Sequence, residues 1–159
     1  MIADSVVNEW FSSLPKTDRI YRLIEKSMDD RGSKERMGAV MALGNSGDPR
    51  AVTSLMGCCR DPNPEIRRSA IEGLQTLRSG RAVEVLLDRL NDQWECPENR
   101  QCATRALAAI RSYGAIAGLR ERYTDEDEDP AIRSIIAEEL GWGTDTVTRV
   151  NSPDPLSRQ

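Results

Sequence analysis

Apolar residues recur along this chain at helical spacing, and the whole pattern occurs four times at nearly constant intervals. The marker of each repeat is an arginine followed three residues later by a small or aliphatic residue and seven residues later by leucine, as in Arg67, Ala70 and Leu74. Residues at these spacings lie on one side of an α-helix, so each marker predicts a helix with one buried stripe. The marker arginines are Arg36, Arg67, Arg100 and Arg133, which gives a period of about 33 residues.

Prolines follow the same period and predict where these helices begin. Pro64, Pro97 and Pro130 are evenly spaced, and proline is favoured at the first helical position because its missing N–H costs no hydrogen bond there. A further apolar stripe between the markers predicts a second helix in each unit, preceded by a residue of a type that caps helices. These capping candidates are Thr17, Asp48, Ser79 and Ser112.

The units therefore read as four helical hairpins, at residues 17–45, 48–78, 79–112 and 113–142. A hairpin of this length cannot bury its apolar face alone, so neighbouring hairpins stack. We expect an all-α fold, an α-α superhelix forming a right-handed solenoid. Residues 1–16 predict an N-terminal capping helix, because Val6, Val7, Trp10, Phe11 and Leu14 recur there at helical spacing. Residues 143–159 predict an extended C-terminal tail.

Two segments resemble a known repeat family. The sequences GDPRAVTSLMGCCRDPNPEIRRSAIEGLQTL and DEDPAIRSIIAEELG are similar to HEAT repeats, in particular to the short HEAT-like repeats of phycobilisome lyase-related proteins. The resemblance extends over about four-fifths of the chain. It implies an armadillo-like solenoid, and this fold serves scaffolds, adaptors and a few enzymes.

The recurrent arginines need acceptors, because a cation in the first turn of a helix opposes the helix dipole. The aspartate that ends the preceding helix is the obvious partner. The resemblance to HEAT repeats likewise implies an internal ladder that ties the repeats together. Its expected members are Arg36, Arg67, Arg100, Arg133, Asp30, Asp61, Asp92 and Asp125.

A candidate binding surface lies one and five residues after each marker arginine, on the flank of the second helix that lines the concave side of a solenoid. Methionine adapts its shape to a partner, and arginine makes forked hydrogen bonds to carboxylates. This mixed surface favours a protein or peptide partner, and the alternative is a solvated face. Its residues are Met37, Met41, Arg68, Glu72, Gln75, Gln101, Arg105 and Glu138.

Charge and composition argue against two classes of partner, nucleic acids and membranes. The chain has 22 Lys and Arg against 26 Asp and Glu, a net charge of −4, so we expect no nucleic-acid partner. No apolar run is long enough to span a membrane, and the first residues lack a signal-peptide pattern, so we expect a cytoplasmic protein without a membrane partner. The oligomeric state is left open.

Metal and cofactor sites are not expected. Cys58, Cys59, Cys96 and Cys102 lack the CxxC spacing of a zinc site, and reduced thiols pack as small apolar groups. The acidic run 125–129 lacks the spacing of a calcium-binding EF-hand loop. A solvated turn that complements the helix dipole, a basic partner and calcium all stay open for that run.

The sequence also argues against an enzyme. Deoxyhypusine hydroxylase-like proteins of the HEAT type use paired His-Glu motifs to hold di-iron, and this chain contains no histidine. No glycine-rich phosphate loop and no nucleophilic serine or cysteine motif is present. We therefore expect a non-enzymatic scaffold or adaptor that binds another protein. The alternative is an auxiliary subunit of a chromophore lyase or of a cofactor-maturation enzyme.

Overall fold

The computed structural model describes residues 16–29 and 32–142, and within these ranges the chain consists of helices joined by short turns. This confirms the predicted all-α fold. The helices are α2 (Lys16–Ser27), α3 (Ser33–Asn45), α4 (Ala51–Cys58), α5 (Pro64–Leu77), the 3-10 helix η1 (Gly80–Ala82), α6 (Val83–Asn91), α7 (Pro97–Ile110), α8 (Tyr113–Thr124) and α9 (Pro130–Leu140).

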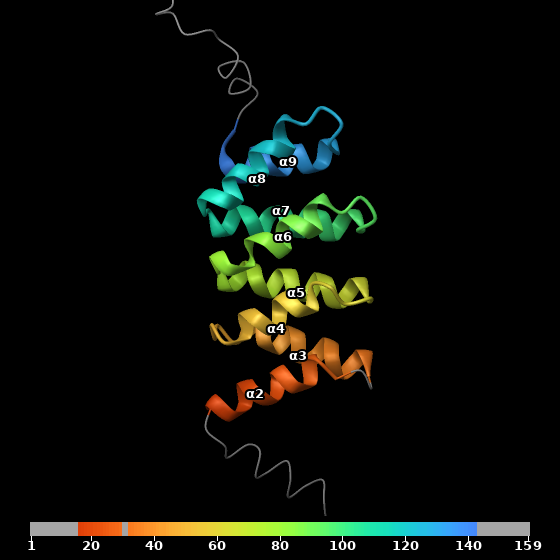
Figure 1. Ribbon diagram of the computed structural model, residues 1–159, viewed down its shortest axis with the longest axis vertical. Coiled ribbons are helices and arrows are strands. Elements are labelled where there is room, and N and C mark those ends of the chain that lie inside the picture. The colour runs from red at the N-terminus through yellow and green to blue at the C-terminus, as the bar shows by residue number, and fades with distance from the viewer. Residues whose placement is uncertain (1–15, 30–31, 143–159) are drawn as a thin grey trace, which may run out of the picture.

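Consecutive helices pair as antiparallel hairpins, and the hairpins stack into an elongated solenoid (Figure 1). Helices α3, α5, α7 and α9 form one layer, and α2, α4, α6 and α8 form the other. The turns inside the hairpins, at 59–63, 92–96 and 125–129, lie along one long edge, which we call the hairpin-turn edge (Figure 1). The links between hairpins, at 46–50, 78–82 and 111–112, lie along the opposite edge, which we call the connector edge.

The buried stripe predicted from the repeat is confirmed. Of its eight residues, seven are buried and Leu140 is half-buried. The buried seven are Ala39, Leu43, Ala70, Leu74, Ala103, Leu107 and Ile136. Since each stripe faces both its own hairpin and the next, one continuous core runs through the described part of the solenoid.

Helices α3 and α5 approach each other more closely than side chains would normally permit. A Cβ atom placed on Gly44 would lie 2.7 Å from the Cα atom of Gly73, and one on Gly73 would lie 2.8 Å from the Cα atom of Gly44. The two helices therefore touch through their backbones at this crossing, and no larger residue fits at either position.

Proline begins the second helix of three hairpins, as predicted: Pro64, Pro97 and Pro130 are the first residues of α5, α7 and α9. The side chains of Asn63 and Asp129 cap their helices by accepting hydrogen bonds from backbone N–H groups. Before α7 the corresponding residue is Cys96, whose side chain makes no such bond.

The predicted start of the first helix in each hairpin is confirmed for only some hairpins. Ser112 caps α8 by accepting from the N–H of Ala115 at 3.3 Å. Ser79 precedes η1 without a capping bond from its side chain. Asp48 lies three residues before α4, because its carboxylate accepts from the N–H of Arg50 and forms a turn there instead. Thr17 lies inside α2, whose first residue is Lys16.

Two further predictions concern the two ends of the chain. The capping helix expected at 1–16, with Trp10 and Phe11, lies almost entirely outside the described residues, and so does the tail expected at 143–159. Within the described ranges, none of the helices combines the length and the apolar character needed to cross a membrane.

Candidate partner-binding face

The marker arginines reach forward to acidic residues in the next hairpin. The Arg36 guanidinium contacts the Asp61 carboxylate at 3.2 and 3.3 Å. Arg67 holds Glu95 through two parallel hydrogen bonds, from Nε at 2.8 Å and from Nη2 at 2.7 Å. Arg100 Nη2 donates to Glu128 at 2.6 Å. Each pair therefore links two successive hairpins along the hairpin-turn edge.

This direction corrects the predicted pairing for Arg67 and Arg100, which assigned each arginine the aspartate of the preceding turn. The turn after α4 and the end of α6 contribute main-chain carbonyls instead. Arg67 Nη1 donates to the carbonyl of Asp61 at 2.7 Å, and Arg100 Nε donates to that of Leu90 at 2.8 Å. The Leu90 carbonyl lies in the last turn of α6, where a carbonyl lacks an intrahelical donor and carries partial negative charge, so it suits a guanidinium without a carboxylate.

The remaining ladder residues have other roles. Asp92 pairs with Arg89 of its own hairpin, and Asp125 pairs with Arg122 in the same way, each at 3.2 Å. Arg133 makes no side-chain bond to any of the described residues. Asp30 lies outside those residues. The structure thus brings together only part of the predicted ladder.

The central acids of the ladder, Glu95 and Glu128, were not among the predicted members. Both side chains are almost fully buried, and each lies between two arginines. Glu95 also accepts from Arg89 at 3.1 Å, and Arg122 lies 3.7 Å from Glu128. A signal for them exists in the sequence, since the two acids occupy equivalent positions of successive repeats, as do the two additional arginines.

The charge state of Glu95 follows from its surroundings. Burial alone would raise the pKa of this carboxyl, but hydrogen bonds from Arg67 and Asn99 outweigh burial and lower the pKa to about 2. Asn99 donates to the carboxylate at 3.0 Å and also to the carbonyl of Pro64 at 2.9 Å. Glu95 is therefore ionised at neutral pH and joins α5, α6 and α7 at one point.

The acidic run 125–129 is largely used by the fold itself. Asp125 accepts from the N–H of Asp127, Glu128 belongs to the ladder, and Asp129 caps α9. Glu126 and Asp127 remain exposed. No cluster of three potential metal-binding side chains occurs among the described residues.

The predicted binding residues all lie on the layer formed by α3, α5, α7 and α9. Met41 is 53% exposed, and Glu72 and Glu138 are exposed as well. The others are half-buried: Met37, Arg68, Gln75, Gln101 and Arg105. We call this surface the second-helix face.

Two hollows lie on the second-helix face, between successive helices. One, of about 100 Å³, lies between α3 and α5 and is bordered by Met41, Asn45, Ser69, Glu72 and Thr76 around the glycine contact. The other, of about 460 Å³, lies between α5 and α7. Glu72 and Thr76 border both hollows, and we call the two adjacent hollows together the groove across α5.

Some of the predicted binding residues are engaged in contacts between hairpins. Arg68 Nε donates to the side-chain oxygen of Asn99 at 3.4 Å, and the Ser69 hydroxyl donates to the sulfur of Met37 at 3.2 Å. Met41, Glu72 and Arg105 have no such contact within the described part of the chain. Of these three residues Met41 and Glu72 are exposed and Arg105 is half-buried, so each presents at least part of its side chain to a partner.

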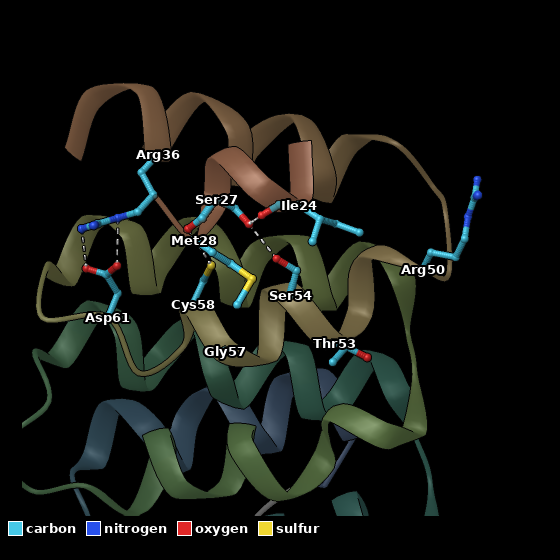
Figure 2. Close-up of a pocket in the computed structure, with 10 residues that line it drawn as sticks. All are labelled: Ile24, Ser27, Met28, Arg36, Arg50, Thr53, Ser54, Gly57, Cys58 and Asp61. Carbon is cyan, nitrogen blue, oxygen red and sulfur yellow. Dashed lines mark hydrogen bonds and ion pairs between the residues drawn. The ribbon is translucent and has the colours of Figure 1, made fainter. Parts of the chain in front are cut away.

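A third hollow, of about 370 Å³, lies between α2 and α4 in the other layer (Figure 2). The hydroxyl groups of Ser27 and Ser54 face each other at 2.6 Å, and the Arg36 and Asp61 pair closes one side. In the repeat, Ser27 and Cys58 correspond to Arg89 and Arg122 of the later hairpins. Their short side chains leave open the space that a long arginine side chain would occupy.

Part of the chain matches a known family of helical repeats. The family model for HEAT repeats matches residues 20–96. This part of the chain consists of HEAT repeats. A search of curated proteins gives no match.

Two solved structures share the fold of this chain. Human deoxyhypusine hydroxylase in complex with glycerol superimposes with a TM-score of 0.68 at 26% identity, over 77% of this chain and 42% of that one. The complex of CpcE and CpcF of phycocyanin lyase from Nostoc sp. PCC7120 gives a TM-score of 0.64 at 22% identity, over 78% of this chain and 52% of that one. This chain thus spans about half, or less, of the chains it resembles.

Proposed function

We propose that this protein is a non-catalytic scaffold that binds a partner protein along the second-helix face. The observation that carries the proposal is the groove across α5. Its lining combines a flexible apolar side chain, Met41, with the charged side chain of Glu72, and Arg105 lies on α7 of the same face. Such a combination suits a protein surface, which presents both apolar and charged groups.

The residue types of the chain support a non-catalytic role. The sequence has no histidine and therefore lacks the His-Glu motifs expected of a deoxyhypusine hydroxylase-like enzyme. Burial raises the pKa of Cys59 to about 12, and burial also raises the pKa values of Cys58 and Cys102. These thiols are consequently poor nucleophiles at neutral pH.

A second candidate function is an auxiliary subunit of a chromophore lyase or of a cofactor-maturation enzyme. The likeness of fold to the CpcE and CpcF complex favours it. The hollow between α2 and α4 supplies a mostly apolar wall for a small molecule, including Ile24 and Met28. Pigment or cofactor retained by the purified protein would support this candidate over the scaffold.

The scaffold proposal is tested by exchanging charges on the second-helix face. In the double variant Glu72→Arg with Arg105→Glu the net charge is unchanged, but the order of charges on the face is reversed. A partner is first identified by affinity capture from native extract and mass spectrometry, and is then purified. We expect its affinity for the variant to fall at least tenfold, since a central interface arginine commonly contributes about 2 kcal/mol or more.

A matched exchange on the other layer provides the control. Arg60 and Asp88 are both exposed and lie 3.6 Å apart, so Arg60→Asp with Asp88→Arg preserves both the net charge and the pair. This control should bind the partner as wild type does. The proposal fails if the groove variant, folded by circular dichroism, retains full affinity. It also fails if only truncation after residue 143 abolishes binding.

A further inference from the structure

Two arginines on the connector edge adopt a backbone conformation that ordinarily favours glycine. Arg78 and Arg111 follow α5 and α7 with φ values of 48° and 54°, and they occupy equivalent positions of successive repeats. At the end of α9 the same role is taken by Gly141, with φ of 67°. Glycine adopts this conformation without strain, so the two arginines are disfavoured on backbone grounds alone.

The charges of these arginines are not compensated by the fold. Arg111 donates only to the main-chain carbonyl of Glu139, and the nearby Arg81 donates only to the hydroxyl of Thr53. Within the described part of the chain, no carboxylate lies at ion-pair distance from Arg78, Arg81 or Arg111. All three are exposed.

The hairpin-turn edge differs in this respect, because Arg36, Arg67 and Arg100 are all paired there with acids. Among the described arginines of the connector edge, only Arg50 has a carboxylate partner, Asp48. Figure 2 shows Arg50 at the far side of the first hairpins, pointing outward. The three uncompensated arginines thus form a basic strip along one edge of an otherwise acidic molecule.

The spacing of the strip sets the shape of a complementary ligand. Helices packed side by side lie about 8–10 Å apart, so the links of successive hairpins recur at about that distance along the edge. An extended segment of polyproline II conformation advances about 3.1 Å per residue with three residues per turn, so three residues cover one hairpin and every third side chain lies on the same side. Tyr113, 92% exposed, lies two residues after Arg111 and offers an aromatic surface beside the strip.

We propose that the strip formed by Arg78, Arg81 and Arg111, with Tyr113, binds an extended acidic segment of a partner protein whose carboxylates recur about every third residue. Charge complementarity favours this occupant, and arginine pairs with carboxylates through forked hydrogen bonds. A nucleic acid is disfavoured, because three contacts release few counterions and the protein carries a net charge of −4.

The strip adjoins the second-helix face, because Arg78 also borders the larger hollow between α5 and α7. The two surfaces differ in chemistry, since the groove mixes apolar and charged groups whereas the strip carries cations and one aromatic ring. The proposal rests on the arginines of the connector edge and does not depend on the scaffold proposal. Loss of partner binding by the groove exchange and loss of peptide binding by the strip variant are therefore separate results.

The probe is a fluorescein-labelled peptide of about 12 residues, long enough to pass several hairpins at about 3.1 Å per residue. It is built of glycine and serine with glutamate at every third position, and its affinity is measured by fluorescence anisotropy at low salt. In the variant Arg78→Gly with Arg111→Gly we expect the affinity to fall about five- to tenfold, as expected for loss of two exposed ion pairs. We expect the melting temperature of this variant to stay equal or to rise, since glycine relieves the backbone conformation.

Matched controls separate a local site from general attraction. The variant Arg60→Gln with Arg120→Gln removes two exposed charges elsewhere and should bind the peptide as wild type does. If the glycine variant is less stable than wild type, Arg78→Asn with Arg111→Asn replaces it, because asparagine also tolerates positive φ. The single variant Arg81→Gln should weaken binding as well, since it removes a charge of the strip from a residue of ordinary backbone conformation.

Three results would overturn the proposal. The first is an equal loss of affinity in the Arg60 and Arg120 control, which would indicate attraction by net charge alone. The second is equal or tighter binding of a peptide with the same glutamates clustered at one end. The third is tighter binding of a single-stranded DNA of similar length through the same arginines, which would assign the strip to nucleic acid.

Discussion

Replacement of Glu95 by glutamine should destabilise the solenoid strongly, because this carboxylate holds two arginines from two different helices. The glutamine keeps the size of the side chain but removes the charge that Arg67 and Arg89 share. The pKa of Glu95 is lowered from 4.5 to about 2, and each pKa unit corresponds to about 1.4 kcal/mol. The charge therefore contributes about 3 kcal/mol, in keeping with the loss expected when a buried ion pair is broken.

The pH dependence of the effect distinguishes electrostatics from packing. A carboxyl with a lowered pKa in the folded state stabilises that state above pH 4.5, and the contribution is lost as the pH falls toward 2. The difference between wild type and Glu95→Gln should therefore be about 3 kcal/mol at pH 7 and about half as large at pH 3. Urea denaturation followed by circular dichroism at both pH values measures it.

The exposed residue Glu126 provides the matched control, since Glu126→Gln removes one charge from the equivalent turn of the last hairpin. This control should change stability by less than about 0.5 kcal/mol. At pH 7 the melting temperature of the Glu95 variant should fall by about 6–12 °C. A loss at pH 7 as small as that of the control, or a loss that is the same at pH 3, would refute the electrostatic role assigned to Glu95.

Three further measurements test other parts of the structure. Gly73→Ala should lower stability by about 1–3 kcal/mol, because its Cβ would press on the backbone of Gly44. The control Gly38→Ala has open space around it and should raise stability by about 0.5–1 kcal/mol. Equal effects of the two substitutions would contradict the close contact between α3 and α5. Ellman's reagent at pH 7 should leave Cys58 and Cys59 unmodified until denaturant is added, and prompt reaction of all four thiols would contradict their burial. Treatment with a metal chelator should leave the melting temperature unchanged, and a fall would reveal a structural metal.

The helices and the core could be predicted from the sequence because both depend on local spacing. The stripe of Ala70 and Leu74 needs only the geometry of one helix, and Pro64 marks a helix start through its own missing N–H. The cap predicted at Asp48 was wrong in position for a local reason as well. Its carboxylate bonds to the N–H of Arg50 and forms a separate turn before α4.

The ladder could not be assigned in full because its pairs join residues from different hairpins. Arg67 and Glu95 are 28 positions apart, and local reasoning favoured the nearer acid, Asp61. Asp61 does contact Arg67, but through its main-chain carbonyl. The connector strip was missed for a similar reason, since the φ values of Arg78 and Arg111 are not visible in a pattern of residue types.

The identical spacing of the two ladder pairs has a consequence for how such a chain can change length. Arg67 with Glu95 and Arg100 with Glu128 both span 28 positions, and the second pair follows the first by one whole repeat. If one whole repeat were deleted or duplicated as a block, each arginine would still meet a glutamate in the following hairpin. A block shorter by one or two positions would instead shift the acid out of reach and turn the helix stripe away from the core. The ladder therefore tolerates the gain or loss of a whole repeat, whereas the gain or loss of part of a repeat disrupts it. This favours growth of the solenoid by duplication of whole repeats.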